Sequence, residues 1–284
     1  MRRSLFLGSR RCFSTNSILV NKRSDGVCII TLNDAPRLNA LTAAMGDTFN
    51  AVIDDLCSTG CQGVGAVVLT GSGRAFSAGG DLEFLRERAA DTPLRNSIVM
   101  RRFYDRFLSL RRLPVPIIAA INGPAVGAGM CVALACDMRI ANRSSKMGFT
   151  FTKLGLHPGM GATHFLSPVV GPQQASRLLF TGELITAERA LSIGLISDIS
   201  DGDCVDDAIA LAQSMASSSS VAVRTCVRSL RMKQDEGLDR ALTREADSQS
   251  QCYVTDDLRN GVEAIARKEK PVFAAPVGFQ DPLL

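Results

Sequence analysis

The chain contains 284 residues, 46% of them hydrophobic, and carries a formal net charge of +4 at pH 7. This length and apolar fraction exclude an intrinsically disordered chain and predict a large α/β core with an appended helical part. Residues 1–13 hold four arginines and no acid, so the rest of the chain is close to neutral. The charge pattern therefore gives no basis for nucleic-acid binding.

Residues 1–24 are typical of a mitochondrial transit peptide with a disordered lead. The segment holds six basic residues and no acid, interspersed with Leu, Phe and Ile. Arg11 lies just before Phe13 and Ser14, as arginine does ahead of a matrix-protease cleavage site. We therefore expect the mature protein in the mitochondrial matrix. The alternative is a basic tail without a targeting role.

The first predicted elements after this lead are a strand at residues 26–32, a turn, and an amphipathic helix at 42–58. A short buried strand follows at 66–70, and then the sequence AFSAGGDL at 75–82. The glycines of this sequence have no side chains, so the backbone is uncovered just before a predicted helix at 82–90. We expect Asp81 to cap that helix.

Residues 117–137, IIAAINGPAVGAGMCVALACD, form the most distinctive stretch of the chain. An apolar strand ends at Asn122-Gly123-Pro124, and a helix-like run begins after two more glycines. A helix start presents unpaired N–H groups that suit a developing negative charge on oxygen. The alternative is a strand-turn-helix whose glycines serve packing alone. Asn122, Gly123 and Pro124 interrupt the run, so no membrane span is expected.

Further along, KLGLHPGMGAT occupies 153–163 and LLFTGELITAERALSIGLI occupies 178–196. From residue 204 onward the periodicity is purely helical, with Thr255 as the expected cap of the last helix. We therefore divide the chain into the lead (1–24), an α/β core (25–203) and a C-terminal helical region (204–284). The nine scattered cysteines lack metal-site spacing, and we expect most of them to be small buried hydrophobes.

Together these four motifs, in this order and spacing, resemble the crotonase (enoyl-CoA hydratase/isomerase) superfamily over about residues 26–273. The resemblance implies a spiral of repeated strand-strand-helix units with a helical C-terminal trimerisation region. It also implies an acyl-CoA thioester as partner, coenzyme A being part of the substrate and no separate cofactor or metal being needed. The expected assembly is a homotrimer or a dimer of trimers.

Members of that family hold the thioester carbonyl between two backbone N–H groups, and the motifs place these at Gly80 and Ala128. The tail at residues 267–273 resembles a segment that reaches a neighbouring subunit's coenzyme A in relatives. Phe103, Tyr104 and Phe107 either shape the acyl pocket or pack in the core. The remaining substrate contacts that the resemblance implies are Arg37, Leu38, Ala40, Ala78, Gly79, Asp81, Leu82, Gly127, Cys131, Phe151, Pro158, Gly159, Lys268, Lys270 and Phe273.

The two glutamates that hydratases of the family use as general acid and base are both replaced. Cys131 occupies the first position and Phe151 the second. A phenyl ring has no ionisable proton, and a buried thiol is a poor base. His157 is then the best general acid or base by type and position, because imidazole titrates near neutral pH. The alternative is a histidine that is merely hydrogen-bonded in its loop.

Three functions remain open from the sequence. The first is a hydratase or isomerase of fatty-acid or branched-chain acyl-CoA metabolism that uses non-standard groups such as His157. The second is another reaction on the same oxyanion hole, such as decarboxylation of a malonyl-type thioester or thioester hydrolysis. The third is a non-catalytic acyl-CoA binding protein. Decarboxylation needs enolate stabilisation and little acid–base help, so it would suffer least from losing both glutamates.

Overall fold

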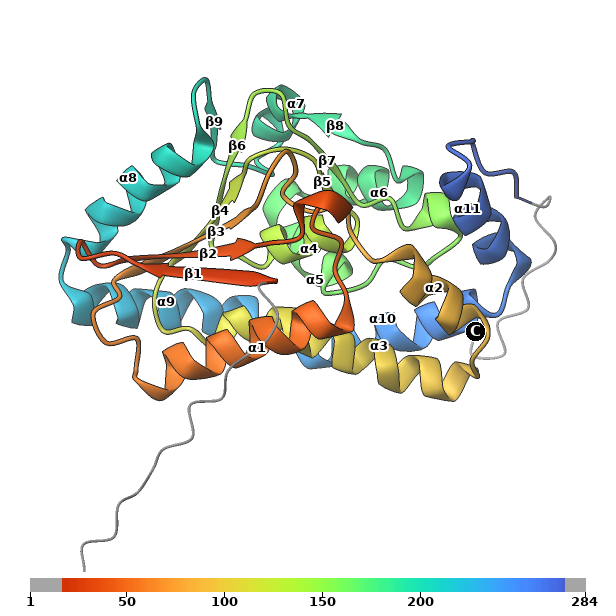
Figure 1. Ribbon diagram of the computed structural model, residues 1–284, viewed down its shortest axis with the longest axis horizontal. Coiled ribbons are helices and arrows are strands. Elements are labelled where there is room, and N and C mark those ends of the chain that lie inside the picture. Colours follow the sequence, from red (N-terminus) through yellow and green to blue (C-terminus); the bar gives the residue numbers. More distant parts are fainter. Residues whose placement is uncertain (1–16, 274–284) are drawn as a thin grey trace, which may run out of the picture.

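The computed structural model describes residues 17–273, and these are built around a twisted, mostly parallel sheet (Figure 1). Within this sheet, only the first two strands pair in antiparallel orientation. Each inner strand is short, apolar and buried along most of its length, as expected of a parallel strand covered on both faces. In order across the sheet the strands are β1 (Ile18–Lys22), β2 (Val27–Leu32), β3 (Ala66–Gly71), β4 (Ile117–Ile121), β6 (Met138–Asn142) and β9 (Asp198–Ser200).

A second, smaller sheet lies next to the first and carries the loops of interest. Its central strand β7 (Lys146–Gly148) pairs in parallel with β5 (Ala125–Val126) and antiparallel with β8 (Ile185–Thr186). Because β5 follows directly after the Asn-Gly-Pro turn, this pairing fixes the glycine-rich segment before the next helix.

The remaining elements are helices, which surround the sheets (Figure 1). Three are short 3-10 helices: η1 (Ala35–Arg37), η2 (Ser109–Arg112) and η3 (Thr152–Leu154). The α-helices up to residue 192 are α1 (Ala43–Ser58), α2 (Leu82–Ala89), α3 (Pro93–Leu108), α4 (Ala128–Leu134), α5 (Ala162–Val170), α6 (Pro172–Thr181) and α7 (Ala187–Ser192). The C-terminal helices are α8 (Cys204–Ala216), α9 (Ser220–Gln234), α10 (Leu238–Tyr253) and α11 (Asp256–Ala266). None of the helices among residues 17–273 is both long and apolar enough to cross a membrane.

Two of the predicted helix caps are confirmed. The Asp81 carboxylate accepts hydrogen bonds from the amides of Glu83 and Phe84 at 3.1 Å, so it caps α2. Thr255 accepts a bond from the amide of Leu258 and caps α11. Each cap satisfies a backbone donor that the helix itself leaves unpaired, which stabilises the helix start by about 1 kcal/mol.

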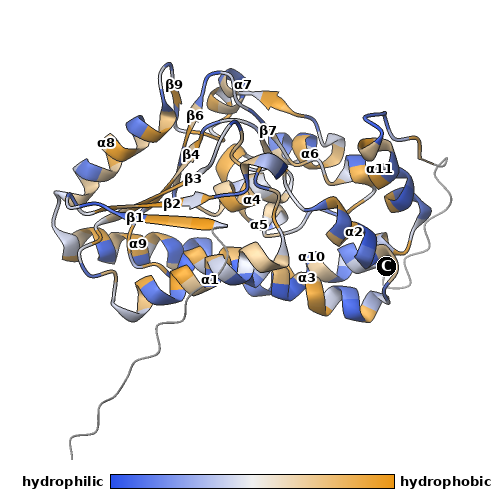
Figure 2. Cartoon of the chain, viewed as in Figure 1, coloured by the Kyte–Doolittle hydropathy of each residue, from blue (hydrophilic) through white to orange (hydrophobic). Residues whose placement is uncertain are grey.

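The division of the chain at residue 204 does not correspond to a break in packing. In helix α8, Cys204, Ala208 and Ala212 pack against Val68 and Ile118 of the central strands. Figure 2 shows hydrophobic residues on α8 between hydrophilic ones, the alternation that a helix needs to cover a sheet on one side. The helical region therefore completes the core that the earlier strands begin.

The predicted lead also needs a correction at its C-terminal end. Residues 1–16 lie outside the described residues, but Ile18–Lys22 forms strand β1 and pairs with β2 in antiparallel register. Ile18 is buried, and the apolar Ile-Leu-Val run supplies β propensity that the basic flanks conceal. The folded part thus begins before residue 25.

A buried ion pair joins helix α9 to the start of the central strand. The Arg231 guanidinium binds Asp137 through Nε at 2.9 Å and donates to the carbonyls of Leu113 at 2.6 Å and Val115 at 3.1 Å. Asp137 in turn accepts the amide of Ile117 at 2.8 Å. The pair therefore ties the segment before β4 to Asp137, which follows α4. These bonds fix where β4 begins.

We predict that Arg231→Met lowers the free energy of unfolding by about 3 kcal/mol, because Asp137 loses its nearest cation while Arg111 stays 3.9 Å away, and the carbonyls of Leu113 and Val115 lose their donor. Chemical denaturation measures this change. Arg228→Met, on an exposed position of the same helix, is the matched control and should change stability by less than about 0.5 kcal/mol. Equal effects of the two substitutions would contradict a special role for the buried pair.

Candidate active site

Two glycine-rich loops lie side by side between the sheets. The amide of Ser77 donates to the carbonyl of Pro124 at 3.1 Å, and the amide of Val126 donates back to Ser77 at 3.0 Å. Gly129 allows this approach, because a methyl group on it would lie 2.6 Å from the Ser77 side chain. The two motifs that the sequence analysis singled out are therefore joined by backbone pairing.

Gly80 and Ala128, the predicted oxyanion donors, both line one cavity next to these loops. Ala128 is the first residue of α4, and its N-cap Gly127 has no side chain to cap the helix. Gly127 itself has φ of +53°, a conformation that glycine adopts easily. Its amide donates a hydrogen bond to the carbonyl of Gly148. The helix start therefore faces the cavity with bare backbone, as an oxyanion hole requires.

Asn39 holds the loop before Gly80 in its conformation through hydrogen bonds. It is fully buried, adopts a positive φ of 54°, and its side-chain amide donates to the carbonyls of Ser72 and Ala75. The hydroxyl of Ser77 donates to the carbonyl of Asn39 at 2.8 Å. Such local bonds offset the cost of the left-handed backbone and make the loop conformation rigid.

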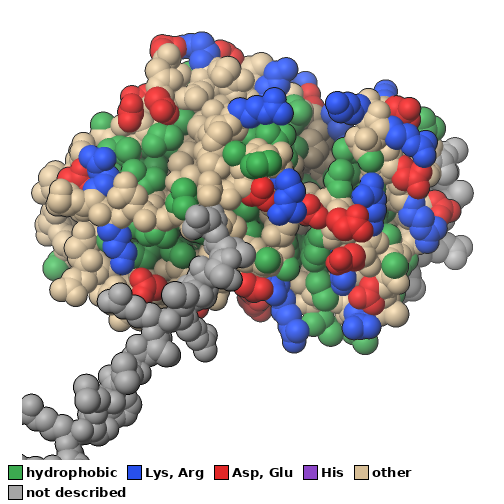
Figure 3. All heavy atoms as spheres, viewed as in Figure 1, with side chains coloured by type: hydrophobic (Ala, Val, Ile, Leu, Met, Phe, Trp, Pro, Cys, Tyr) green, Lys and Arg blue, Asp and Glu red, His purple; other side chains and the backbone are tan. Residues whose placement is uncertain are grey.

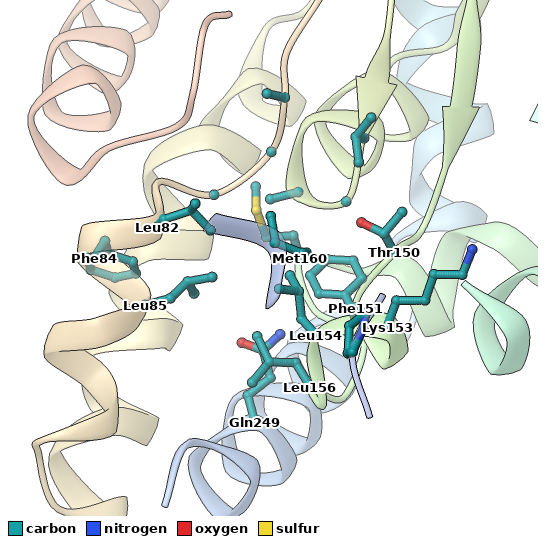
Figure 4. Close-up of a pocket in the computed structure, with 18 of the residues that line it drawn as sticks. Leu82, Phe84, Leu85, Thr150, Phe151, Lys153, Leu154, Leu156, Met160 and Gln249 are labelled. Carbon is teal, nitrogen blue, oxygen red and sulfur yellow. The ribbon is translucent and has the colours of Figure 1, made fainter. Parts of the chain in front are cut away.

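The cavity has a volume of about 670 Å³ and a mostly apolar wall (Figure 4). Helices α2 and α3 supply one side of it and η3 the other. Among the described residues, Glu269 is the only carboxylate that lines it. The remaining lining residues that carry the argument are Leu82, Phe84, Met100, Phe103, Thr150, Phe151, Lys153, Met160 and Lys270.

One end of the cavity holds uncharged polar groups that are already paired. Tyr104 donates to Gln249 Oε1 at 2.9 Å, and Gln249 Nε2 donates to the carbonyl of His157 at 2.7 Å. Tyr253 donates to the sulfur of Met100 at 3.2 Å. Burial raises the pKa of Tyr104 well above 10, so this phenol stays neutral.

His157 does not line the cavity, which corrects the expected placement of this side chain. Its Nδ1 lies 2.6 Å from the carbonyl oxygen of Pro158, and the ring is half-buried in its own loop. Burial lowers the pKa of the imidazole below 6.5, so the ring is neutral at pH 7. The contact with Pro158 matches the alternative for this residue, a histidine that is hydrogen-bonded in its loop.

Cys131 and Phe151, which occupy the two positions where the resemblance implies glutamates, differ in their surroundings. Phe151 lines the cavity with its ring, whereas Cys131 is fully buried and does not line it. The Cys131 thiol donates to the carbonyl of Gly159 at 3.3 Å, and burial raises its pKa well above 9. Neither residue therefore presents a base to the cavity at neutral pH.

Several other predicted contacts lie apart from the cavity wall. Arg37 is exposed and pairs with Asp34 at 2.7 Å, and its guanidinium lies 3.6 Å from Asp81. Figure 3 shows acidic and basic side chains close together over this region around α2. Of the predicted substrate contacts, Ala78, Gly79, Leu82, Gly127, Phe151, Lys270 and Phe273 line the cavity, whereas Arg37, Leu38, Ala40, Asp81, Cys131, Pro158, Gly159 and Lys268 do not.

The C-terminal tail lies on the cavity of its own chain. Lys270 and Phe273 line it, and α11 packs against η3 through Gly261, whose position leaves no room for a methyl group beside Leu154. Within this chain the tail therefore lies against the cavity formed by α2, α3 and η3. Its expected contact with a neighbouring subunit stays a prediction.

Sequence reasoning missed two kinds of site residue. Gln249 comes from α10, far along the chain, and only the helix packing brings it to the cavity. Thr150 and Lys153 flank Phe151, and their cavity placement follows from the loop after β7. Their closeness to Phe151 in the sequence is the signal that indicates the latter two.

Comparisons with known proteins show the family of the chain. The family model described as enoyl-CoA hydratase/isomerase matches residues 22–276. A short-chain-enoyl-CoA hydratase of Clostridium acetobutylicum is 31% identical over 90% of this chain and 96% of its own. A 2,3-dehydroadipyl-CoA hydratase of Escherichia coli is 32% identical over 90% and 98%.

The fold is likewise found among solved structures. The crystal structure of an enoyl-CoA hydratase/isomerase from Mycobacterium paratuberculosis superimposes with a TM-score of 0.80 at 30% identity, over 88% of this chain and 98% of that one. The molecule is thus a mixed α/β protein of the crotonase fold. The chain belongs to the enoyl-CoA hydratase/isomerase family.

The low pKa of His157 predicts a pH dependence of stability. The unfolded chain binds a proton at this ring more readily than the folded one, so stability should be complete above about pH 6.5 and decline as the pH falls below it. His157→Gln should flatten that decline, as measured by denaturant unfolding at pH 7.5 and pH 5.5. Comparing variant with wild type separates His157 from Glu245, whose raised pKa acts in the opposite direction. Parallel profiles would contradict the prediction.

Proposed function

We propose that this protein binds an acyl-CoA thioester and holds its carbonyl oxygen between the backbone amides of Gly80 and Ala128. The observation that carries the proposal is the placement of both residues on one apolar cavity, at the end of paired loops. Family membership supports the class of substrate. Lys153 and Lys270 at the same cavity are the cations available for coenzyme A phosphates.

In this proposal, catalysis comes from stabilising an enolate. Negative charge that develops on the thioester oxygen is met by two fixed N–H dipoles in a cavity with few competing polar groups. Each such donor lowers a barrier by roughly 3–4 kcal/mol in comparable oxyanion holes. Because the donors belong to the backbone, the side chains of residues 80 and 128 contribute little to this part of the chemistry.

The reaction that this cavity favours is decarboxylation of a malonyl-type thioester. The bond between Cα and the carboxylate breaks, its electron pair forms the enolate, carbon dioxide leaves, and solvent supplies the proton. None of these steps needs a carboxylate at Cys131 or Phe151. Water addition across a double bond does need an acid and a base, and Cys131, Phe151 and His157 present neither to the cavity.

The cellular setting is proposed from the sequence. The basic, acid-free N-terminal segment is consistent with import into the mitochondrial matrix, with cleavage after Phe13. The expected homotrimer, or dimer of trimers, comes from the family resemblance. Both proposals bear on where and in what assembly the enzyme acts, and neither alters the chemistry of the cavity.

Ala128→Pro tests the oxyanion hole directly. Proline is accommodated at the first position of a helix, so α4 should still form while the proposed N–H donor is removed. We expect turnover to fall about 10²- to 10³-fold. Circular dichroism and thermal unfolding check that the fold is retained.

A chemical control isolates the carbonyl oxygen. An S-alkyl-CoA thioether has the same shape as the thioester but lacks that oxygen, so its affinity in calorimetry should be similar for wild type and Ala128→Pro. Affinity for the matching thioester should fall in the variant. An equal loss for both ligands would show that the substitution merely blocks the cavity.

The reaction itself is tested with protein that lacks residues 1–13 and a panel of thioesters. We expect carbon dioxide release from methylmalonyl- or ethylmalonyl-CoA and no hydration of crotonyl-CoA. Hydration or isomerisation of an enoyl-CoA would contradict the decarboxylation proposal and would point to Glu269, the carboxylate that lines the described cavity, as the proton-transfer group. Tight binding without product would indicate an acyl-CoA carrier, and free coenzyme A would indicate thioester hydrolysis.

A further inference from the structure

Thr150 places a hydroxyl group next to the loop that carries Ala128. Strand β7 ends at Gly148, whose carbonyl accepts the amide of Gly127 at 2.8 Å, so the two segments are held together by the backbone. A methyl group on Gly127 would lie 3.5 Å from Thr150 Oγ1. Thr150 is half-buried and lines the cavity.

The hydroxyl of Thr150 is also uncommitted. Within residues 17–273 its Oγ1 has no hydrogen-bond partner, whereas Oγ1 of Thr152, two residues on, donates to the carbonyl of Leu179 at 3.1 Å. In Figure 4 the Thr150 hydroxyl points toward the side on which Met160 lies, and the Lys153 amine points the opposite way. A threonine hydroxyl carries one donor and two acceptor sites, so a ligand can use this one directly.

The other uncharged polar side chains of the cavity are already engaged. Tyr104, Gln249 and Tyr253 are hydrogen-bonded among themselves, to Met100 and to the loop at His157. Phe151 presents only a ring. Thr150 is therefore the neutral side-chain donor within the described cavity that is both available and adjacent to the second glycine-rich loop.

We propose that Thr150 Oγ1 donates a hydrogen bond to the thioester oxygen held by the amides of Gly80 and Ala128, as a third member of the oxyanion hole. The inference rests on the proposed function, because it assigns a residue to the same bound oxygen. The bond strengthens as the carbonyl becomes an enolate, since hydrogen bonds to a charged acceptor are about twice as strong as neutral ones. Thr150 thus acts on the transition state more than on binding.

Turnover provides the first test. Thr150→Val removes the hydroxyl but keeps the shape of the side chain, and it should lower kcat about 10- to 100-fold with little change in KM. Thr150→Ser keeps the hydroxyl and should retain kcat within a few-fold. An unchanged kcat in Thr150→Val, or an equal loss in Thr150→Ser, would overturn the assignment.

A spectroscopic readout separates the hydrogen bond from a structural effect. The infrared carbonyl stretch of ¹³C-labelled butyryl-CoA should move to lower frequency on binding to the wild-type protein, because each donor polarises the bond. Thr150→Val should reverse part of that displacement, and Thr150→Ser should retain it. Thr152→Val, which removes a hydroxyl outside the cavity wall, should leave the bound frequency as in wild type.

The same spectra keep this inference distinct from the proposed function. No displacement in wild type, or an undiminished one in Ala128→Pro, would contradict the oxyanion hole itself. A displacement that Ala128→Pro reduces but Thr150→Val leaves intact would overturn only the role of Thr150. A displacement reduced by both substitutions is the expected result.

Discussion

The backbone pairing of two glycine-rich loops is the constraint on which the rest of the site depends. The bonds between Ser77 and the segment Pro124–Val126 join the chain after β3 to the chain after β4, about 50 residues later. Parallel neighbouring strands deliver both loops to the same edge of the sheet, as happens generally at the carboxyl ends of such strands. Once the loops are joined, and the Asn39 side chain holds the first of them, Gly80 and Ala128 line one cavity.

That constraint explains why the two glycine-rich loops can be recognised in the sequence. Glycine is required at Gly129 because Ser77 lies where a side chain would go, and at Gly127 because φ is positive. Both requirements leave a visible mark in the sequence, as do the caps at Asp81 and Thr255. By contrast, strand β1 could not be predicted from the sequence. It is stabilised by pairing with β2, and its neighbours in the sequence are basic and polar.

The side-chain half of the site is less accessible to sequence reasoning. His157 sits in the right loop, yet whether its ring faces the cavity depends on the bond to Pro158 and on Gln249, which comes from α10. Thr150 carries no distinctive signal, because a threonine next to a strand end is common. Its position follows from the register of β7 with β5, and two-residue strands are too short to be placed from periodicity. Long-range packing therefore decides what the local pattern leaves open.

A largely apolar cavity has a chemical consequence of its own. A backbone dipole acts more strongly on a charge when few waters and few competing polar groups surround it. Neither Phe151 nor the neutral, buried thiol of Cys131 carries a negative charge that would oppose an enolate. Neither of these two side chains can activate water. The wall of this cavity thus favours reactions in which negative charge collects on the thioester oxygen and solvent delivers the proton.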